Sequence, residues 1–185
     1  MRALGDTRAW LADGVLDVHH DAPDWSDRIL FDVPGAAVYA IAVQHVDGDA
    51  FELRRGTGAN PQLELYAPLP MGSTARQSEM KYLSGIFERL TFSNAKPLSE
   101  IENIVVLQKV SVTAVNGLIF TLNRLSGDED AGVWANLDVT SVPGISLPEA
   151  AKHELERVRN TVTGWVFLLP RPVSERLKIR LKNFL

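Results

Sequence analysis

Two stretches of this chain alternate apolar and polar residues with a period of two, which is typical of strands that bury one face. The first stretch covers residues 38–46 and the second covers residues 105–115. The positions that share the apolar face are Tyr39, Ile41 and Val43 in the first stretch and Val110 and Val112 in the second. The pattern predicts one strand in each stretch.

A turn signal follows each of these strands at once. The dipeptides are Asp47-Gly48 and Asn116-Gly117, and both tolerate the positive φ that the two central positions of a type I′ turn require. We therefore expect two tight β-hairpins, whose second strands are residues 51–55 and 119–124.

Each hairpin is followed by a third predicted strand, at residues 62–67 and 133–139, and then by a helix. Ser73 or Thr74 is the expected cap of the first helix, and Ser146 with Glu149 forms a capping-box pattern for the second. The helices carry one apolar stripe each, formed by Met80, Leu83, Phe87 and Leu90 in the first and by Ala151, Leu155, Val158 and Val162 in the second.

After each helix the sequence predicts one more strand and a helical segment. The strands are residues 90–92 and 165–167, and the matched Pro-x-Ser-Glu patterns that follow are helix-start signals. They predict a helical turn at residues 99–103 and a terminal helix at residues 174–185.

The matching of these elements indicates an internal duplication. Residues 47–55 recur as residues 116–124 (116 − 47 = 69 positions on), and residues 96–100 recur as residues 171–175 (171 − 96 = 75 positions on). The expected fold is α+β, with two tandem β-β-β-α-β(α) repeats in one pseudo-symmetric domain whose antiparallel meanders carry helices on one face.

The same matching sets the expected boundaries. Residues 1–34 form a lead-in packed on the body, with a strand-like segment at 29–33; residues 35–104 form the first repeat and residues 105–185 the second.

Composition narrows the class of protein. With 45% hydrophobic residues in 185, the chain is long enough to bury a core, and a net charge of −4 provides no global basic surface, so no nucleic-acid partner is expected. The absence of cysteine excludes disulfides and thiol chemistry. No window approaches the ~20 apolar residues of a membrane-spanning helix.

The C-terminal segment differs in charge from the rest of the chain. Residues 171–185 hold five basic residues and one acidic residue. As one helix, this segment would place Leu177, Leu181 and Phe184 on a single face. The candidate interaction residues off that face are Arg176, Lys178, Arg180 and Lys182. We expect the helix to dock on the sheet, with contact to a membrane surface or an acidic partner as the alternative.

Few side chains form patterns typical of catalysis or metal binding. The one group of metal-capable residues, His19-His20-Asp21 with Asp24, supplies too few converging ligands for a zinc site, so no metal or cofactor is expected. No G-x-S-x-G, H-E-x-x-H or S-x-x-K pattern is present. The chain is therefore expected not to be an enzyme.

Two groups of residues are candidates for binding. Arg55 and Arg124 occupy equivalent positions in the duplication, either as a shared anion site or, with more weight, as ordinary strand-end charges. The candidate aromatic lining of a cleft between the repeats is Trp10, Trp25, Tyr66 and Trp134.

Several of these motifs together resemble the bacterial family known as domain of unknown function 4340. The resemblance rests on Trp25-x-Asp27-Arg-Ile-Leu30, the two Gly-containing hairpins, Trp134 and Gly164-Trp165-Val-Phe167. It implies a periplasm-facing domain behind an N-terminal membrane helix, accessory to envelope ABC-transporter or gliding-motility-type components. This chain lacks that helix, so the resemblance implies either a truncated chain or the soluble portion of a longer protein.

The sequence thus predicts a non-enzymatic interaction or scaffold domain, periplasmic or membrane-anchored by resemblance. Its expected partner is a protein or a second copy of itself, bound through exposed strand edges, with weak membrane contact through the basic C-terminal helix. The alternative is a small-ligand or glycan-binding module with a cleft between the repeats.

Overall fold

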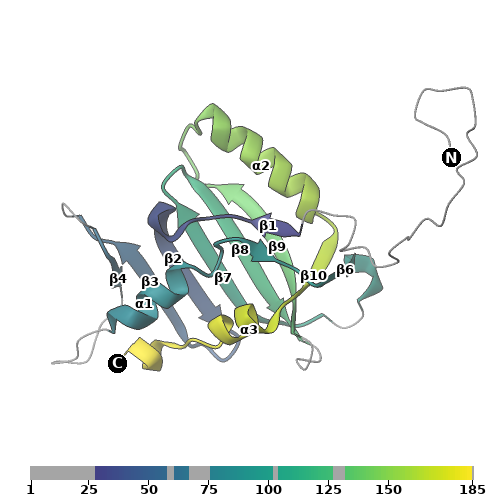
Figure 1. Ribbon diagram of the computed structural model, residues 1–185, viewed down its shortest axis with the longest axis horizontal. Coiled ribbons are helices and arrows are strands. Elements are labelled where there is room, and N and C mark those ends of the chain that lie inside the picture. The colour runs from purple at the N-terminus through teal and green to yellow at the C-terminus, as the bar shows by residue number, and fades with distance from the viewer. Residues whose placement is uncertain (1–27, 58–60, 67–75, 102–103, 127–131, 185) are drawn as a thin grey trace, which may run out of the picture.

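A computed structural model describes residues 28–57, 61–66, 76–101, 104–126 and 132–184. The described chain is mixed α+β, with ten strands in antiparallel sheets and three α-helices, so the predicted class is confirmed. The main sheet has eight strands in the order β4-β3-β2-β7-β8-β9-β10-β6, and β1 pairs with β5 in a second, two-stranded sheet (Figure 1).

Nine of the ten described strands lie close to predicted positions, whereas β6 was not predicted. Their bounds are β1 Ile29–Phe31, β2 Val38–His45, β3 Ala50–Arg55, β4 Leu63–Leu65, β5 Leu90–Thr91, β6 Asn94–Pro97, β7 Val106–Ala114, β8 Leu118–Leu125, β9 Val133–Ser141 and β10 Trp165–Leu169. The helices are α1 Gln77–Ser84, α2 Glu149–Val162 and α3 Arg171–Leu177, with short 3₁₀ turns at Gly35–Ala37, Leu98–Glu100 and Leu181–Phe184.

Strand alternation gives the main sheet one apolar face. Along β7 and β9 every second side chain is buried. In β2 the alternation shifts at an irregularity between Val38 and Ala40, which leaves Tyr39 50% exposed while Ile41 and Val43 stay inward. The prediction that Tyr39 shares their face was therefore wrong, because a bulge reverses the side-chain phase at that point.

Both hairpin turns form where predicted, but neither is type I′. Only the glycines have positive φ, +90° at Gly48 and +88° at Gly117. The N–H of Gly48 donates to His45 O and the N–H of His45 to Asp49 O, so three residues form the loop. This is a type I turn followed by a left-handed glycine, which the same dipeptides also favour.

One layer of helices and loops covers the apolar face of the sheet. In Figure 1, α1, α2, α3 and the β1–β5 pair all lie in front of the main sheet. The stripe of α2 is confirmed, since Ala151, Val158 and Val162 are buried and Leu155 packs against the core. Helix α2 begins after Pro148, so the predicted Ser146 cap is wrong.

Helix α1 is shorter than its stripe predicts. Met80 and Leu83 are buried within it, but the chain leaves the helix at Gly85, and Leu90 belongs to β5. Arg89 has a φ of +45°, and its N–H donates to the carboxylate of Asp32. This bend keeps the apolar residues buried without extending the helix. The predicted caps Ser73 and Thr74 lie outside the described residues.

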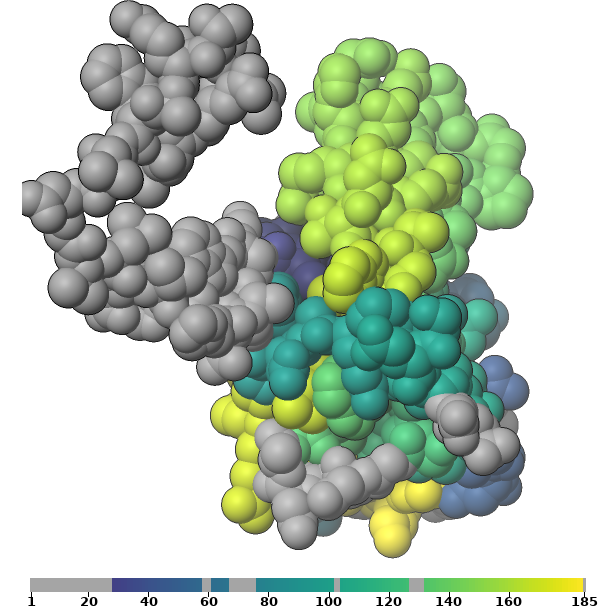
Figure 2. All heavy atoms as spheres, turned by 90° about the vertical axis from the view of Figure 1, so that its right-hand side faces the viewer, coloured from purple at the N-terminus to yellow at the C-terminus, as the bar shows by residue number. Residues whose placement is uncertain are grey.

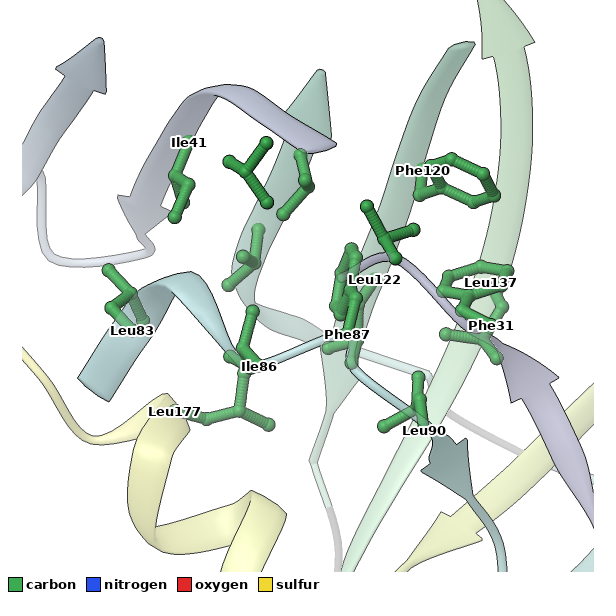
Figure 3. Close-up of a cluster of buried hydrophobic side chains, with 14 of the residues drawn as sticks. Phe31, Ile41, Leu83, Ile86, Phe87, Leu90, Phe120, Leu122, Leu137 and Leu177 are labelled. Atoms are coloured by element: carbon green, nitrogen blue, oxygen red, sulfur yellow. The ribbon is translucent and has the colours of Figure 1, made fainter. Parts of the chain in front are cut away.

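Phenylalanine rings from distant segments meet at the centre of the core. Phe31 of β1 contacts Phe87 and Phe120 edge to face, with ring centroids 5.2 and 5.0 Å apart (Figure 3). Phe51 and Phe184 are paired in the same way at 4.9 Å. The first and last described parts of the chain therefore both close the core.

The predicted terminal helix at 174–185 is not continuous. It divides into α3 and the 3₁₀ turn Leu181–Phe184, because groups of the sheet take the backbone carbonyls between them. The amide Nε2 of Gln108 donates to Leu177 O at 2.7 Å, and His45 Nε2 lies 3.2 Å from Ile179 O. These contacts replace helical hydrogen bonds that the sequence pattern assumed.

Removing the Phe184 ring tests how much the packing of the C-terminal segment contributes to the stability of the fold. Phe184 is fully buried, so Phe184→Ala is expected to lower the free energy of unfolding by about 3–5 kcal/mol in urea denaturation. The control Tyr39→Ala, at a half-exposed position, should change it by about 0.5 kcal/mol or less. Equal effects of the two substitutions would contradict this packing.

Candidate interaction surface

The second face of the main sheet carries no helix among the described residues, and its side chains form rows across the strands. One row, set by direct pairing of neighbouring strands, is Glu52, Ala42, Ser111, Thr121 and Asp138. The next row is Gln44, Lys109, Asn123 and Asn136. All nine are exposed or half-exposed, in contrast to the apolar rows on the covered face. We call these two rows the open face.

A shallow hollow of about 570 Å³ lies at the β3 side of the open face. Its floor is formed by small residues, including Ala42, Ala50 and Ser111, and Lys109 stands at its rim. The Ser111 hydroxyl lies 3.2 Å from that of Thr121, so it is already engaged in a hydrogen bond. The hollow therefore offers a flat floor with charged edges.

Tyr66 borders the same hollow in a stack of three side chains. Its ring is 65% exposed, and the guanidinium of Arg54 lies 4.1 Å from the ring centroid. Arg54 in turn donates from Nε to Glu52 at 2.6 Å, and this hydrogen bond raises the pKa of Arg54. The cation thus covers one face of the Tyr66 ring.

Trp134 lies at the other end of the open face. Lys96 Nζ of β6 is 4.3 Å from its ring centroid, so the pair spans the intervening strand β10. Val166, which pairs with Lys96 on β10, is fully buried.

The aromatic residues predicted to line one cleft do not meet. Tyr66 follows β4 and Trp134 lies in β9, with β3, β2, β7 and β8 between those strands. Trp10 and Trp25 lie outside the described residues.

The four predicted basic interaction residues are not arranged on one helical face. Arg176 donates to Gly85 O at 2.6 Å and lies over Tyr82, and Lys178 pairs with Glu175 at 2.9 Å. Arg180 pairs with Asp47 at 2.7 Å, while Lys182 is exposed. Arg176 and Arg180 thus attach the C-terminal segment to the rest of the fold, and the break after α3 corrects the expectation of a continuous basic amphipathic helix.

Arg55 and Arg124 do not share a site. They lie on β3 and β8, separated by β2 and β7. Arg55 donates to three backbone carbonyls, those of Gly35, Val38 and Pro61, at 2.7–2.9 Å. The shared anion site is therefore ruled out by the order of the strands.

His45 of β2 is only 6% exposed, although it has no nearby partner in the sequence. It lies beside the amide of Gln108, which is 2% exposed and also on the covered face. Strand phase was the available signal, since His45 follows Ile41 and Val43 at the inward positions of β2.

Neither a metal cluster nor a membrane-spanning helix is found in the described part of the chain. Groups of three or more His, Cys, Asp or Glu side chains that could hold a metal are absent from it. None of its helices is long and apolar enough to cross a bilayer. The segment His19-His20-Asp21 with Asp24 lies outside the described residues.

Comparison with known proteins gives no relative of this chain. No family model, no curated protein and no solved structure matches it.

The ion pair between Arg180 and Asp47 should make stability depend on acid pH. The hydrogen bond from Arg180, with that from the Asp49 N–H, lowers the pKa of Asp47 below its usual value. A lowered folded-state pKa means that the pair stabilises the fold above about pH 4 and that this contribution is lost as pH falls through the folded-state pKa.

Arg180→Gln tests this dependence through thermal melting from pH 7 to pH 2. The melting temperature should be lower than that of the unmodified protein at pH 7, and the difference should shrink below about pH 4. In an Asp47→Asn background the same substitution should have a smaller effect. A difference that does not change with pH would contradict the assignment.

Proposed function

We propose that this protein is a non-enzymatic interaction domain that binds a protein partner through the open face of its main sheet. The observation that carries the proposal is the one-sided architecture: the described helices cover one face, and exposed polar rows with a small-residue floor form the other (Figure 1). A flat floor with charged edges suits a protein surface, since interfaces bury their centre and keep a polar rim.

The size of the open face favours a macromolecule. The two rows cross five strands, from β3 to β9, which at about 4.8 Å apart span roughly 19 Å, and five residues of strand length add about 17 Å. The product, roughly 320 Å², is smaller than the ~800 Å² that each partner contributes to a standard interface and fits a small, transient protein contact. The hollow is too shallow to enclose most of a small ligand.

The sheet edges are less suited to pairing than the sequence suggested. β6 has four residues and includes Lys96 and Pro97, two features that block strand addition. Figure 2 views the molecule from this side, where the teal atoms of residues 94–101 lie below α2. β4, at the opposite edge, has three residues. We therefore assign binding to the face rather than to an edge.

We also propose that the sheet arose by duplication of a β-β-β-α-β(α) unit. Ala42 and Ser111, which the sequence offset of 69 makes equivalent (111 − 42), lie directly opposite each other across β2 and β7. The hairpin pair Ile41–Leu53 has its counterpart in Val110–Leu122 at the same offset. This register supports a local twofold axis between Ala42 and Ser111, at the centre of the open face.

The two proposed copies differ after their third strands. Leu53 pairs with Leu65 and Leu122 with Leu137, so the offset has grown to 72 (137 − 65) in the third strand. β5 pairs with β1 outside the main sheet, whereas its counterpart β10 joins the main sheet beside β9. The proposed symmetry is therefore limited to the six strands from β4 to β9.

For the cellular setting, we propose a periplasm-facing accessory of an envelope transport system, anchored to the membrane in its full-length form. The support is the resemblance to domain of unknown function 4340, whose motif residues Trp134 and Trp165 lie on the neighbouring strands β9 and β10.

The alternative is a small-ligand or glycan-binding module, and the observation that supports it is the hollow beside Tyr66. Gln44, Lys109 and Ser111 offer hydrogen-bonding groups next to an exposed ring. However, Arg54 already occupies one face of that ring, and Trp134 is too far across the sheet to continue a stacking platform. A protein partner is therefore preferred.

Site-specific photo-crosslinking in cells that naturally express the protein tests the open face. A benzophenone amino acid at position 111 or 121 should give a covalent adduct with the partner, and one at the exposed position 156 of α2 should not. Lys109→Glu should reduce the adduct by about fivefold or more, because it reverses a charge at the rim.

The matched control is Lys152→Glu, the same charge reversal on α2, which should leave the adduct unchanged. Light scattering of the purified protein then shows whether the partner is a second copy. Equal crosslinking at position 156, or adducts that survive Lys109→Glu, would refute binding through this face.

A further inference from the structure

A second cavity lies away from the open face, between α1, the β4 edge and the turn at Gly35–Ala37. Its volume is about 200 Å³. The polar side chains that line it are Arg55, Gln62, Gln77, Lys81 and Ser84. Leu63 and Met80 supply its apolar wall.

Arg55 is the central charge of this cavity. Its side chain is half-buried, and the guanidinium is fixed by the three carbonyls of Gly35, Val38 and Pro61. A guanidinium has five N–H donors, so two remain after these bonds. Among the described residues, no Asp or Glu forms an ion pair with Arg55.

The rest of the lining adds positive charge. Lys81 contributes an ammonium group, and none of the described residues that line the cavity carries a carboxylate. The Ser84 hydroxyl already donates to Lys81 O at 2.7 Å. Two cations at one cavity give it a positive potential that attracts an anion from solution.

We propose that this cavity binds a small oxyanion, the carboxylate or phosphate group of a low-molecular-weight ligand. After the three carbonyl bonds, one N–H remains on each of Nη1 and Nη2, and these can donate to the oxygens of such a group. A cavity of about 200 Å³ accepts a phosphate or a short dicarboxylate, and excludes a polymer. This site is independent of the open face and of the proposed protein partner.

Titration with inorganic phosphate and with succinate, at ionic strength held constant with sodium chloride, tests the proposal. Binding is followed by calorimetry and by the NMR signal of the Arg55 Nε–H, which should shift and saturate. Lys81→Gln should weaken saturable binding by about fivefold or more, because it removes one of the two cations while leaving Arg55 in place.

Lys152→Gln is the matched control, since it also removes one helix-surface lysine and changes the net charge equally. The affinity of this variant for either anion should stay within about twofold of that of the unmodified protein. Preference for phosphate or for succinate identifies which oxyanion the site selects, and saturation by either supports the proposal. It is overturned if neither anion saturates the Arg55 signal up to about 50 mM, or if both lysine variants lose affinity equally.

Discussion

Burial of the inner face of the eight-stranded sheet is the interaction on which the rest of the structure depends. That face is a continuous apolar surface contributed by strands from β2 to β10, and its core includes Phe120, Leu122 and Leu137. Removing apolar surface from water is worth about 25 cal/mol per Å², so a sheet of this size is stable only with a cover. The cover is assembled from segments far apart in the chain, as Figure 3 shows for Phe31, Leu83 and Leu177.

The need for this cover explains the polar contacts at the end of the chain. Gln108 and His45 lie on the covered face, where an unpaired polar group is costly. The carbonyls of Leu177 and Ile179 supply partners for the Gln108 Nε2 and the His45 ring, while Gln108 Oε1 has no partner among the described residues. Arg180 adds an ion pair to the β2–β3 turn. These polar groups are engaged on the covered side of the sheet. The opposite side keeps its two exposed rows, and it is the side proposed here as the binding surface.

Much of the fold could be predicted from the sequence, because it depends on local signals that tertiary contacts do not override. Asn116-Gly117 forced a turn, and the alternation of β7 and β9 matched the burial of Val110, Val112 and Leu137. These signals depend on backbone conformation and on a single buried face, both of which are visible in the sequence.

Other features depended on contacts that no local pattern contains. The terminal helix was interrupted because Gln108, 69 residues before Leu177 (177 − 108), takes its carbonyl. Tyr39 turned outward because of a bulge, and Tyr66 was separated from Trp134 by the order of strands. The cavity at Arg55 could not be predicted either, since its lining comes from four separate segments.

The central claim is that one face of the sheet is closed and the other is open in the isolated protein. Hydroxyl-radical footprinting read by mass spectrometry tests this claim most directly, because aromatic side chains react readily when water reaches them. The account predicts rapid labelling of Tyr66 on the open side, with Phe31, Phe120 and Phe184 on the covered side protected until the protein unfolds. Protection of Tyr66 in the isolated monomer, or labelling of the three phenylalanines under native conditions, would contradict it.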